Sequence, residues 1–370
     1  MNVLIPNLGS TSLKYQILDM PAESVLTRGR MERVTDYRQA IAQVRTGETR
    51  IEAVGLKAVL AGPDYRGTFL VDDALIGAME EFLPAAPAHN AIYLTAIRAF
   101  REAMPGVPLV AAFEPEFHAG MPDHARHYGV PLSWRAEGVV KYGFHGASHQ
   151  YVAERAAALL GGAPRLVSCH LGGSSSMCAV LHGRSIDTTM GFSPQSGLEN
   201  ATRHGDLDVF AVLFMMERHG WTIAETRRQL ATGGGLAGLS GIAGGDVRDL
   251  EQAAATGGDR AALALEVFVY QVRKTIGAYA AAMGGLDAVA FTGGIGENSA
   301  LLRAECCRGL EFLGIELDPA ANAGGHGDRL ISSRGSRVEV LALATNEEVV
   351  VARRAYRKLA ALGLAMGAEA

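Results

Sequence analysis

Cysteine is scarce in this sequence, and the few cysteines form no metal-binding pattern. The 370 residues contain Cys169, Cys178, Cys306 and Cys307. Their spacing fits no metal site, and the adjacent Cys306 and Cys307 are poorly placed for a mutual disulfide. We therefore expect reduced thiols in a cytoplasmic protein. The sequence also lacks a signal-type leader and an apolar run long enough to span a bilayer, so we expect no membrane partner.

A strong excess of one charge is also missing. The net charge is −5, charged residues make up 20% of the chain, and no long basic run occurs. These properties argue against a protein that binds nucleic acid or a membrane surface. The chain instead has a globular composition with 48% hydrophobic residues. At this length, two domains are the simplest expectation.

Strand-like and helix-like patterns alternate along the chain. Apolar runs predict buried strands at residues 53–62, 108–114 and 286–293. Helices are predicted at residues 72–83, 148–160 and 259–283, with a further helix after Asn298. This alternation predicts an α/β fold in which helices cover the sheets.

Two segments of the chain resemble each other. VLIPNLGSTSLKYQIL (3–18) and LVSCHLGGSSSMCAVL (166–181) each read as a strand, Leu-Gly, a turn of small residues and a second strand. Asn7 aligns with His170, and Ser12 aligns with Ser176. Such turns can be similar by chance. Alternatively they begin two duplicated domains that face each other across a cleft, where small residues would let backbone N–H groups bind an anion.

Lys14 follows the first of these turns. It lies on the outgoing strand and not at the start of a helix, so a Walker-type loop is not indicated. Lys14 shares a strand face with Ser12, and its ammonium group could reach a phosphate from there. The alternative is an ordinary solvated lysine.

Seven motifs occur in one order and together resemble a known family. They are NLGSTSLKY, APAHN, YGFHGASH, CHLGGSSSM, TTMGFSPQSGLENATRHGDLD, FTGGIGEN and TNEEVVVA. The chain resembles the acetate kinase family of the actin-like ATPase superfamily, except around residues 20–52, which look shorter than the family segment. The resemblance implies two duplicated actin-like (ribonuclease H-like) domains with a cleft between them. The first domain would comprise residues 1–118 and 349–370 on the carboxylate side. The second would comprise residues 119–348 on the nucleotide side and form a homodimer interface.

The resemblance also implies site residues and ligands. ATP would be the co-substrate, and Mg²⁺ (or Mn²⁺) would be positioned by Asn7 and Glu347. The implied catalytic residues are Glu114, His145 and Arg203. The residues implied for phosphate and nucleotide binding are Ser10, Ser12, Lys14, His170, Gly172, Gly173, Ser174, Asp246, Arg248, Gly294, Gly296, Glu297 and Asn298. The residues implied for the carboxylate substrate are Lys57, Val59, Ala88, His89, Phe144 and Pro194.

Phosphoryl transfer gives some of these residues a physical rationale. It needs fixed donors around the equatorial oxygens, and a guanidinium group such as that of Arg203 can bind a phosphate with two N–H groups. A structural ion pair of Arg203 with Asp206 or Asp208 is the alternative. His145 and His149 have the spacing of a zinc pair, but no third ligand is evident. We therefore expect His145 to face phosphate, with a structural histidine as the alternative.

Two helix starts carry further predictions. The glycines of GGIGEN lie between a strand and a helix, where free N–H groups suit a nucleotide, although glycine also serves close strand–helix packing. Thr345 and Glu348 match a capping box. That prediction would leave Glu347 free to orient a metal-bound water, and Asn7 and Glu347 are hard oxygen ligands suited to Mg²⁺.

The chain departs from the family at several of these positions. Lys57 replaces the arginine that grips the carboxylate, and Glu114 replaces an aspartate, so substrate orientation should change. Ala88 replaces a leucine and should widen the acyl pocket. Gly173, Ser174 and Ser175 stand where the family has Asn-Gly-Gly, and serine hydroxyls could replace the lost amide. Glu199 is a new carboxylate near Arg203 that would compete with phosphate.

The sequence therefore favours an ATP- and Mg²⁺-dependent kinase that converts a small carboxylate into an acyl phosphate by direct in-line transfer. One alternative is a relative that acts on a longer or different acid, or that uses pyrophosphate as the phosphoryl donor. Another is a binding protein that holds nucleotide but has lost transfer activity. Because Lys57 and Glu114 keep the charge of the family residues, an altered active site is favoured over a decayed one.

Overall fold

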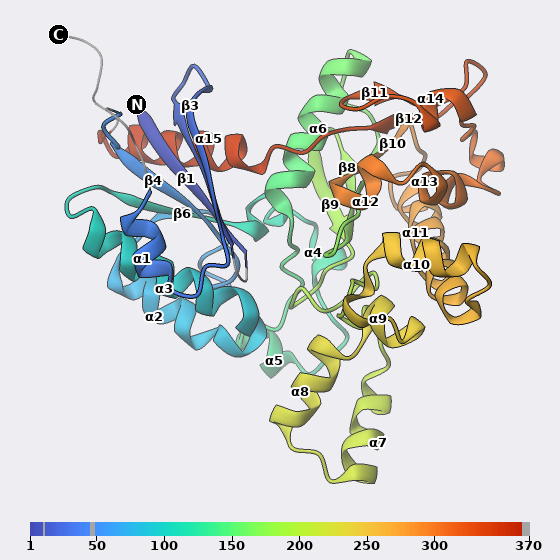
Figure 1. Cartoon of the computed structure of the whole chain (residues 1–370), viewed down its shortest axis with the longest axis horizontal. Helices are drawn as coiled ribbons and strands as arrows, with labels where there is room; N and C mark the ends of the chain where they lie inside the picture. The colour runs from blue at the N-terminus through green and yellow to red at the C-terminus, as the bar shows by residue number, and fades with distance from the viewer. Residues whose placement is uncertain (10–11, 45–48, 365–370) are drawn as a thin grey trace.

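The structure, a computed structural model, describes residues 1–9, 12–44 and 49–364. Two mixed sheets, each of six strands among these residues, lie in separate lobes (Figure 1). In spatial order the first sheet contains β3 (Ser24–Glu32), β2 (Ser12–Asp19), β1 (Asn2–Leu8), β4 (Ala53–Ala58), β6 (Leu109–Phe113) and β5 (Thr68–Leu70). The second contains β9 (Arg184–Thr188), β8 (Ser176–Leu181), β7 (Leu166–His170), β10 (Ala288–Thr292), β12 (Glu339–Ala342) and β11 (Arg329–Leu330).

The two sheets share one topology. Strand β1 pairs antiparallel with β2 and parallel with β4, and β7 pairs in the same way with β8 and β10. The next strands outward, β6 and β12, are parallel, and the edge strands β5 and β11 are antiparallel. The duplication expected from the two similar hairpins is therefore confirmed, and a chance similarity of two turns does not explain it.

Alternating side chains of the first sheet contact helices on opposite faces. Leu4 and Leu8 of β1 belong to a core cluster with α1 (Tyr37–Ala42), α2 (Asp73–Glu81) and α3 (Pro87–Ala103). Val3 and Ile5 of the same strand pack with α15 (Glu347–Ala361) on the other face. The last helix of the chain thus returns to the lobe formed by the first strands (Figure 1).

The second sheet is covered in the same manner. On one face lie α9 (Gly235–Ser240), α10 (Val247–Ala255), α11 (Asp259–Ala282) and α13 (Ala300–Cys307). The other face packs against α6 (Gly146–Leu160). Helices α7 (Val209–His219) and α8 (Ile223–Thr232) project from this lobe (Figure 1). The remaining α-helices are short: α4 (Asp123–Arg126), α5 (Leu132–Ala136), α12 (Gly293–Asn298) and α14 (Pro319–Ala323). Four 3₁₀ turns complete the described elements: Leu83–Ala85, Glu114–His118, Ala243–Gly245 and Glu311–Leu313.

The elements predicted from the sequence are present, with shifted ends. The run 53–62 forms a strand only over Ala53–Ala58, and α6 begins at Gly146, two residues before its predicted start. All four cysteines are buried and free, as expected. Within the described ranges, none of the helices has both the length and the apolar character that crossing a bilayer requires.

The start of α6 lies directly against the 3₁₀ turn Glu114–His118. A Cβ atom on Gly146 would lie 2.0 Å from the carbonyl oxygen of Glu114, so only glycine fits without backbone movement. Gly77 in α2 has no atom within 4 Å of such a position. The two glycines therefore offer a matched pair of substitutions.

We expect Gly146→Ala to destabilise the protein by ~1–3 kcal/mol, because the added methyl group displaces backbone. Gly77→Ala should stabilise it by ~0.5–1 kcal/mol, because alanine loses less backbone entropy in a helix. Denaturant midpoints of the two variants and the parent chain would test both signs. Equal effects of the two substitutions would contradict the close approach at Gly146.

Candidate functional site

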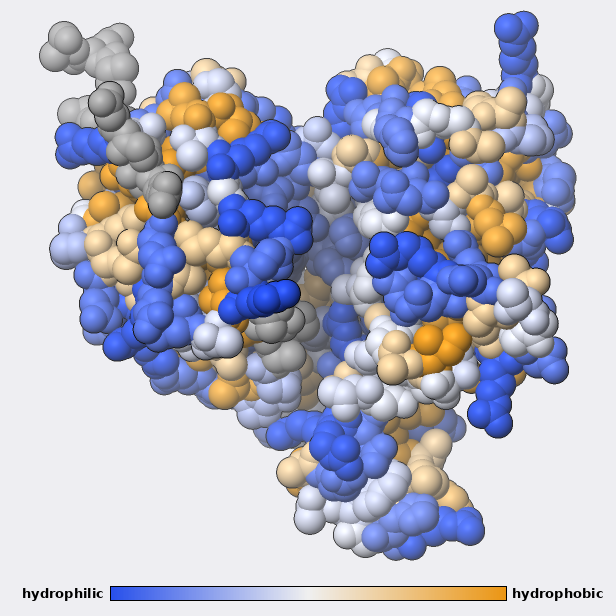
Figure 2. Space-filling view, viewed as in Figure 1, coloured by the Kyte–Doolittle hydropathy of each residue, from blue (hydrophilic) through white to orange (hydrophobic). Residues whose placement is uncertain are grey.

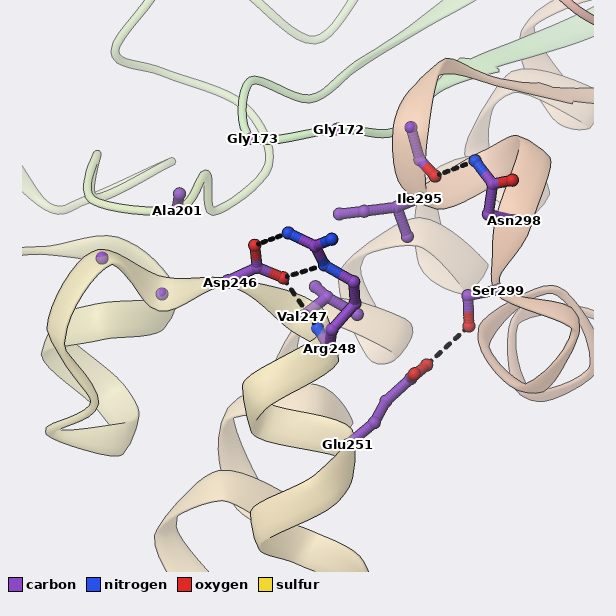
Figure 3. A pocket seen from close by; sticks show the side chains of 13 residues that line it. Gly172, Gly173, Ala201, Asp246, Val247, Arg248, Glu251, Ile295, Asn298 and Ser299 are labelled. Carbon is purple, nitrogen blue, oxygen red and sulfur yellow. Dashed lines mark hydrogen bonds and ion pairs between the residues drawn. The ribbon is translucent and has the colours of Figure 1, made fainter.

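A hollow separates the two lobes (Figure 2), and a cavity of about 600 Å³ opens in the second lobe (Figure 3). Its lining includes predicted nucleotide-binding residues, namely Gly172, Gly173, Asp246, Arg248, Gly294 and Asn298. The lining comes from the β7–β8 turn, the start of α10 and the helix α12. Three segments far apart in sequence therefore meet around one cavity.

Glycine permits this meeting at two positions with positive φ. A Cβ atom on Gly293 (φ +77°) would lie 2.7 Å from the carbonyl oxygen of Leu171, which accepts hydrogen bonds from the next turn of α12. A Cβ atom on Gly245 (φ +59°) would lie 2.2 Å from the carbonyl oxygen of Ala201. Both contacts bring backbone to the cavity wall at distances that side chains would prevent.

Asp246 and Arg248 form one edge of the cavity (Figure 3). Asp246 caps α10, and its carboxylate accepts from the Arg248 guanidinium at 3.0 and 2.6 Å. These hydrogen bonds, first those from the guanidinium, lower the pKa of Asp246 to about 2. The edge therefore carries a fixed ion pair whose arginine is exposed.

Gly296 and Glu297 do not line the cavity but support it from behind. Glu297 Oε1 accepts from the backbone N–H of Gly293 at 3.1 Å. The buried Arg303 donates to the carbonyl oxygens of Gly296 (2.8 Å) and Glu297 (2.9 Å), and also to Asn322. Burial lowers the pKa of Arg303 to about 10. Arg303 thus holds the end of α12 in place. No signal in the sequence distinguished it from an ordinary helical arginine.

Histidines lie at the point where α6 meets the second hairpin. His145, in a left-handed conformation (φ +55°), precedes α6 and stacks on His170 with ring centroids 4.3 Å apart. Its Nδ1 lies 2.8 Å from Ser176 Oγ, and its Nε2 lies 3.0 Å from Ser174 Oγ. His170 Nδ1 lies 2.8 Å from Ser148 Oγ. The predicted residues His145, His170 and Ser174 are thus brought together.

His149 is buried beside them and does not form a zinc pair with His145. Both of its ring nitrogens contact serine hydroxyls, as do both nitrogens of His145. No cluster of three His, Cys, Asp or Glu side chains in residues 1–9, 12–44 and 49–364 is arranged to hold a metal. Burial lowers the pKa of both histidines well below the ordinary value, and the neighbouring His170 and His149, followed by Lys57 and Arg203, lower that of His145 further. Both imidazoles are therefore neutral at neutral pH.

Lys57, near the end of the central strand β4 of the first sheet, lies between two carboxylates. Its Nζ is 2.5 Å from Glu347 Oε2 and 3.4 Å from Glu114 Oε1. Burial raises the pKa of Glu114. Burial also acts to raise the pKa of Glu347, but Lys57 and His170 outweigh it and hold that pKa below its usual value. Oε2 of Glu114 is buried and has no hydrogen-bond partner among the described residues.

The predicted capping box at α15 is wrong. Asn346 is the N-cap, and its side chain accepts from the N–H of Val349, while Thr345 donates to Ser148. An amide side chain one residue later outcompetes the threonine. Glu348 instead accepts from Asn7 Nδ2 at 3.0 Å. Glu347, expected to be free, is the carboxylate that pairs with Lys57.

Arg203 makes no ion pair with a described carboxylate. Its Nη1 donates to the carbonyl oxygen of Pro194 at 2.6 Å. Asp206 accepts from the Gly197 N–H, and Asp208 caps α7, so the structural ion pair considered for Arg203 is absent. Burial lowers the pKa of Arg203 to about 10.

Glu199 was expected to compete with phosphate for Arg203, and the structure contradicts this. Glu199 is buried, and its Oε2 has no hydrogen-bond partner among the described residues. Among the same residues it makes no ion pair with Arg203, whose Nη1 donates to Pro194. Its neighbour Asn200 accepts from the backbone N–H of Ser175 at 2.5 Å. Asn200 therefore ties the second turn to the segment that carries Arg203.

The remaining predicted residues are placed as follows. Ser12 and Lys14 lie on β2, and Lys14 is exposed and forms no ion pair with another described residue. Val59 and Phe144 are buried in the core cluster of the first lobe, and Pro194 is also buried. Ser10 lies outside the described residues. Ala88 and His89 belong to α3, but their side chains lie outside the described part of the chain.

Known proteins share this sequence and arrangement. Residues 39–353 match the model of the acetokinase family. Acetate kinase of Geobacillus kaustophilus is 43% identical over 390 aligned positions, covering 96% of this chain and 98% of that protein. Acetate kinase of Bacillus subtilis is 39% identical, with 96% and 98% coverage.

Solved structures agree with the sequence comparison. The crystal structure of Porphyromonas gingivalis acetate kinase superposes with a TM-score of 0.86 at 33% identity, covering 97% of this chain and 99% of that one. A propionate kinase from Francisella tularensis gives a TM-score of 0.88 at 30% identity, with 96% and 99% coverage. The two similar α/β lobes are thus those of the actin-like ATPase fold, as expected. The chain belongs to the acetokinase family.

Proposed function

We propose that this chain transfers the γ-phosphoryl group of ATP to a small carboxylate and so forms an acyl phosphate. One observation carries the proposal: the buried Glu114 and the partly buried Lys57 and Glu347 lie near the neutral His145 and His170 between two duplicated lobes, close to Arg203. Phosphoryl transfer is catalysed chiefly by positioning and by fixed charge. The relatives named acetate and propionate kinase support this reading.

The site also fits a divalent cation. Oxygen donors gather near the ends of the central strands β1 and β6, where Asn7 contacts Glu348, and Glu114 carries an oxygen with no partner among the described residues. Mg²⁺ binds hard oxygen ligands and keeps several waters, so few protein ligands suffice. We propose Asn7 and Glu347 as the residues that hold Mg²⁺ or Mn²⁺. When bound, the ion would neutralise phosphate charge near the carboxylates.

The residues of the two turns, with His145 and Arg203, would then act on the phosphates. The turn around Ser12 with Lys14, and the turn of Gly172, Gly173 and Ser174, would hold the phosphates. His145 and Arg203 would donate to the equatorial oxygens of the moving group. A carboxylate oxygen of the substrate forms the bond to phosphorus as the bond to the β-phosphate oxygen breaks, and ADP leaves.

Lys57 would orient the substrate carboxylate. An ammonium group has three donors, and Glu347 and Glu114 engage two of them. One N–H therefore remains for the substrate. A lysine offers a point charge where an arginine would offer a planar fork, so the substrate would be held less tightly.

We also propose the domain limits and the assembly. The first domain would comprise residues 1–118 and 349–370, and the second residues 119–348. Packing of α15 on the first sheet supports this division. A homodimer would form through the second domain, where Leu263, Tyr270 and Leu301 are exposed around one groove of α11 and α13.

The acid and the donor can be identified by trapping acyl phosphates with hydroxylamine. Acetate, propionate and longer acids would be tested with Mg²⁺ and either ATP or pyrophosphate. We expect hydroxamate formation with a short acid and ATP. Hydroxamate formation with pyrophosphate but not with ATP would identify pyrophosphate as the phosphoryl donor. No hydroxamate with any pair, together with measurable ATP binding, would show a nucleotide-binding protein without transfer activity.

Arg203→Ala should lower kcat by ~10²–10³-fold, because it removes a donor to the transition state. Folding should change little, since among the described residues Arg203 makes no ion pair and donates to the carbonyl oxygen of Pro194. Steady-state rates and thermal midpoints would be measured together. Arg101→Ala, which removes a surface ion pair with Asp73, is the control with unchanged turnover. A near-normal kcat for Arg203→Ala would remove this residue from the mechanism.

Lys57→Arg should lower the KM for a short carboxylate by about 3- to 10-fold, because a planar guanidinium group can donate a second charge-assisted hydrogen bond to the substrate carboxylate. Lys57→Met should raise this KM and also lower the thermal midpoint, since Glu114 and Glu347 lose their counter-charge. An unchanged KM for Lys57→Arg, with a destabilised Lys57→Met, would mean that Lys57 serves only as a counter-ion.

A further inference from the structure

A line of hydrogen bonds runs from the interior of the second lobe to the cleft. Ser168 Oγ on β7 lies 2.9 Å from His149 Nδ1, and His149 Nε2 lies 2.8 Å from Ser176 Oγ. The same Ser176 Oγ lies 2.8 Å from His145 Nδ1. Ser168, His149 and Ser176 are fully buried. All four residues lie on or next to strands and a helix, which leaves little freedom to rearrange.

Counting protons shows two directions in which this series of hydrogen bonds can run. Each neutral imidazole has one N–H, and each serine hydroxyl has one proton. Ser176 contacts two ring nitrogens, so it can donate to one and accept from the other, or accept from both. In the first direction Ser168 donates to His149, His149 to Ser176, and Ser176 to His145 Nδ1, which leaves the His145 proton on Nε2. The second direction reverses every bond and puts that proton on Nδ1.

Ser168 decides between the two directions. Among the described residues its hydroxyl has no hydrogen-bond partner except His149. In the reversed direction Ser168 would accept from His149 and its own proton would be buried without an acceptor. If Ser176 accepts from both rings, its own proton is likewise buried without an acceptor among the described residues, and His145 carries its proton on Nδ1. The penalty for an unpaired buried hydroxyl therefore favours the first direction over either alternative by about 5- to 100-fold. Ser174, at the other end, is only partly buried, so its hydroxyl can be satisfied in either direction.

We propose that Ser168 and His149 are positioning residues that fix His145 as the Nε2–H tautomer, with this proton facing Ser174 and the cleft. His145 then offers a neutral donor to an incoming anion. With the opposite tautomer it would present a lone pair, which repels anionic oxygen. The assignment of the tautomer stands on the hydrogen bonds alone, whereas its consequence for catalysis rests on the proposed function.

Nitrogen-15 spectroscopy of the full chain, labelled at histidine, measures the tautomer directly. The His145 signals are identified by their loss in His145→Gln. We expect at least about 70% Nε2–H in the parent chain, given the penalty for an unpaired hydroxyl. Ser168→Ala removes the hydroxyl that sets the direction, so His145 should become a mixture of both tautomers. Ser168→Thr keeps a hydroxyl and should restore the parent spectrum.

Two further variants make the test specific. Ser176→Ala removes the hydroxyl that joins His149 to His145, so His145 should again become a mixture of both tautomers. Ser185→Ala is the matched control, since Ser185 is an equally buried serine that contacts His118 and does not belong to this series of hydrogen bonds. His145 should be unaffected by it. A parent chain with Nδ1–H, or a Ser168→Ala spectrum like the parent, would overturn the inference.

Kinetics separates this inference from the proposed function. At equal tautomer populations, Ser168→Ala should lower kcat by about twofold with an unchanged KM for ATP, because only the Nε2–H form of His145 donates to the transition state. Ser168→Thr should restore kcat. If the tautomer shifts but kcat does not, the positioning role stands and the catalytic role of His145 fails.

Discussion

The ammonium group of Lys57 lies between the carboxylates of Glu114 and Glu347, and much of the site depends on this arrangement. The three residues come from β4, from the turn after β6 and from the first residue of α15. One cation therefore draws together segments that are 57 residues apart (Lys57 to Glu114) and 290 residues apart (Lys57 to Glu347). Buried ion clusters contribute little stability compared with apolar packing. This cluster instead fixes the positions of two carboxylates and one cation beside the ends of the central strands β4 and β6.

The contacts between α15 and α6 give the cluster a firm base. Arg354 of α15 is buried, donating to Gln150 of α6 at 2.6 Å and to the carbonyl oxygen of Phe113 at 3.3 Å. Thr345 donates to Ser148, which in turn contacts His170. The two lobes are thus joined behind the site by hydrogen bonds to the chain segments that carry Glu114, Glu347 and His145. Movement of the lobes that keeps these bonds would change the cleft while leaving the reactive groups in register.

Much of this could be predicted from the sequence, because the two hairpin turns and the glycine-rich helix starts have strong local signals. The repeat of 3–18 in 166–181 predicted the duplication that both sheets show. Predictions failed where a contact between residues far apart in the sequence determines the local structure. Thr345 matched a capping box, but Ser148 engages its hydroxyl and Asn346 caps the helix instead. The roles of Arg303, Asn200 and Ser168 were not predictable, since each depends on a partner brought close only by folding.

Charge explains why the direction of the histidine chain matters. Lys57 and Arg203 already place two cations near His145, and burial makes a third one unfavourable, so its imidazole is neutral. A neutral ring attracts an anion only through an N–H group, and it has just one. The site therefore needs both the desolvation that removes the charge and the hydrogen bonds that direct the remaining proton. Ser176 serves the second need, because it contacts the Nδ1 atom of His145 inside the protein and leaves Nε2 facing Ser174.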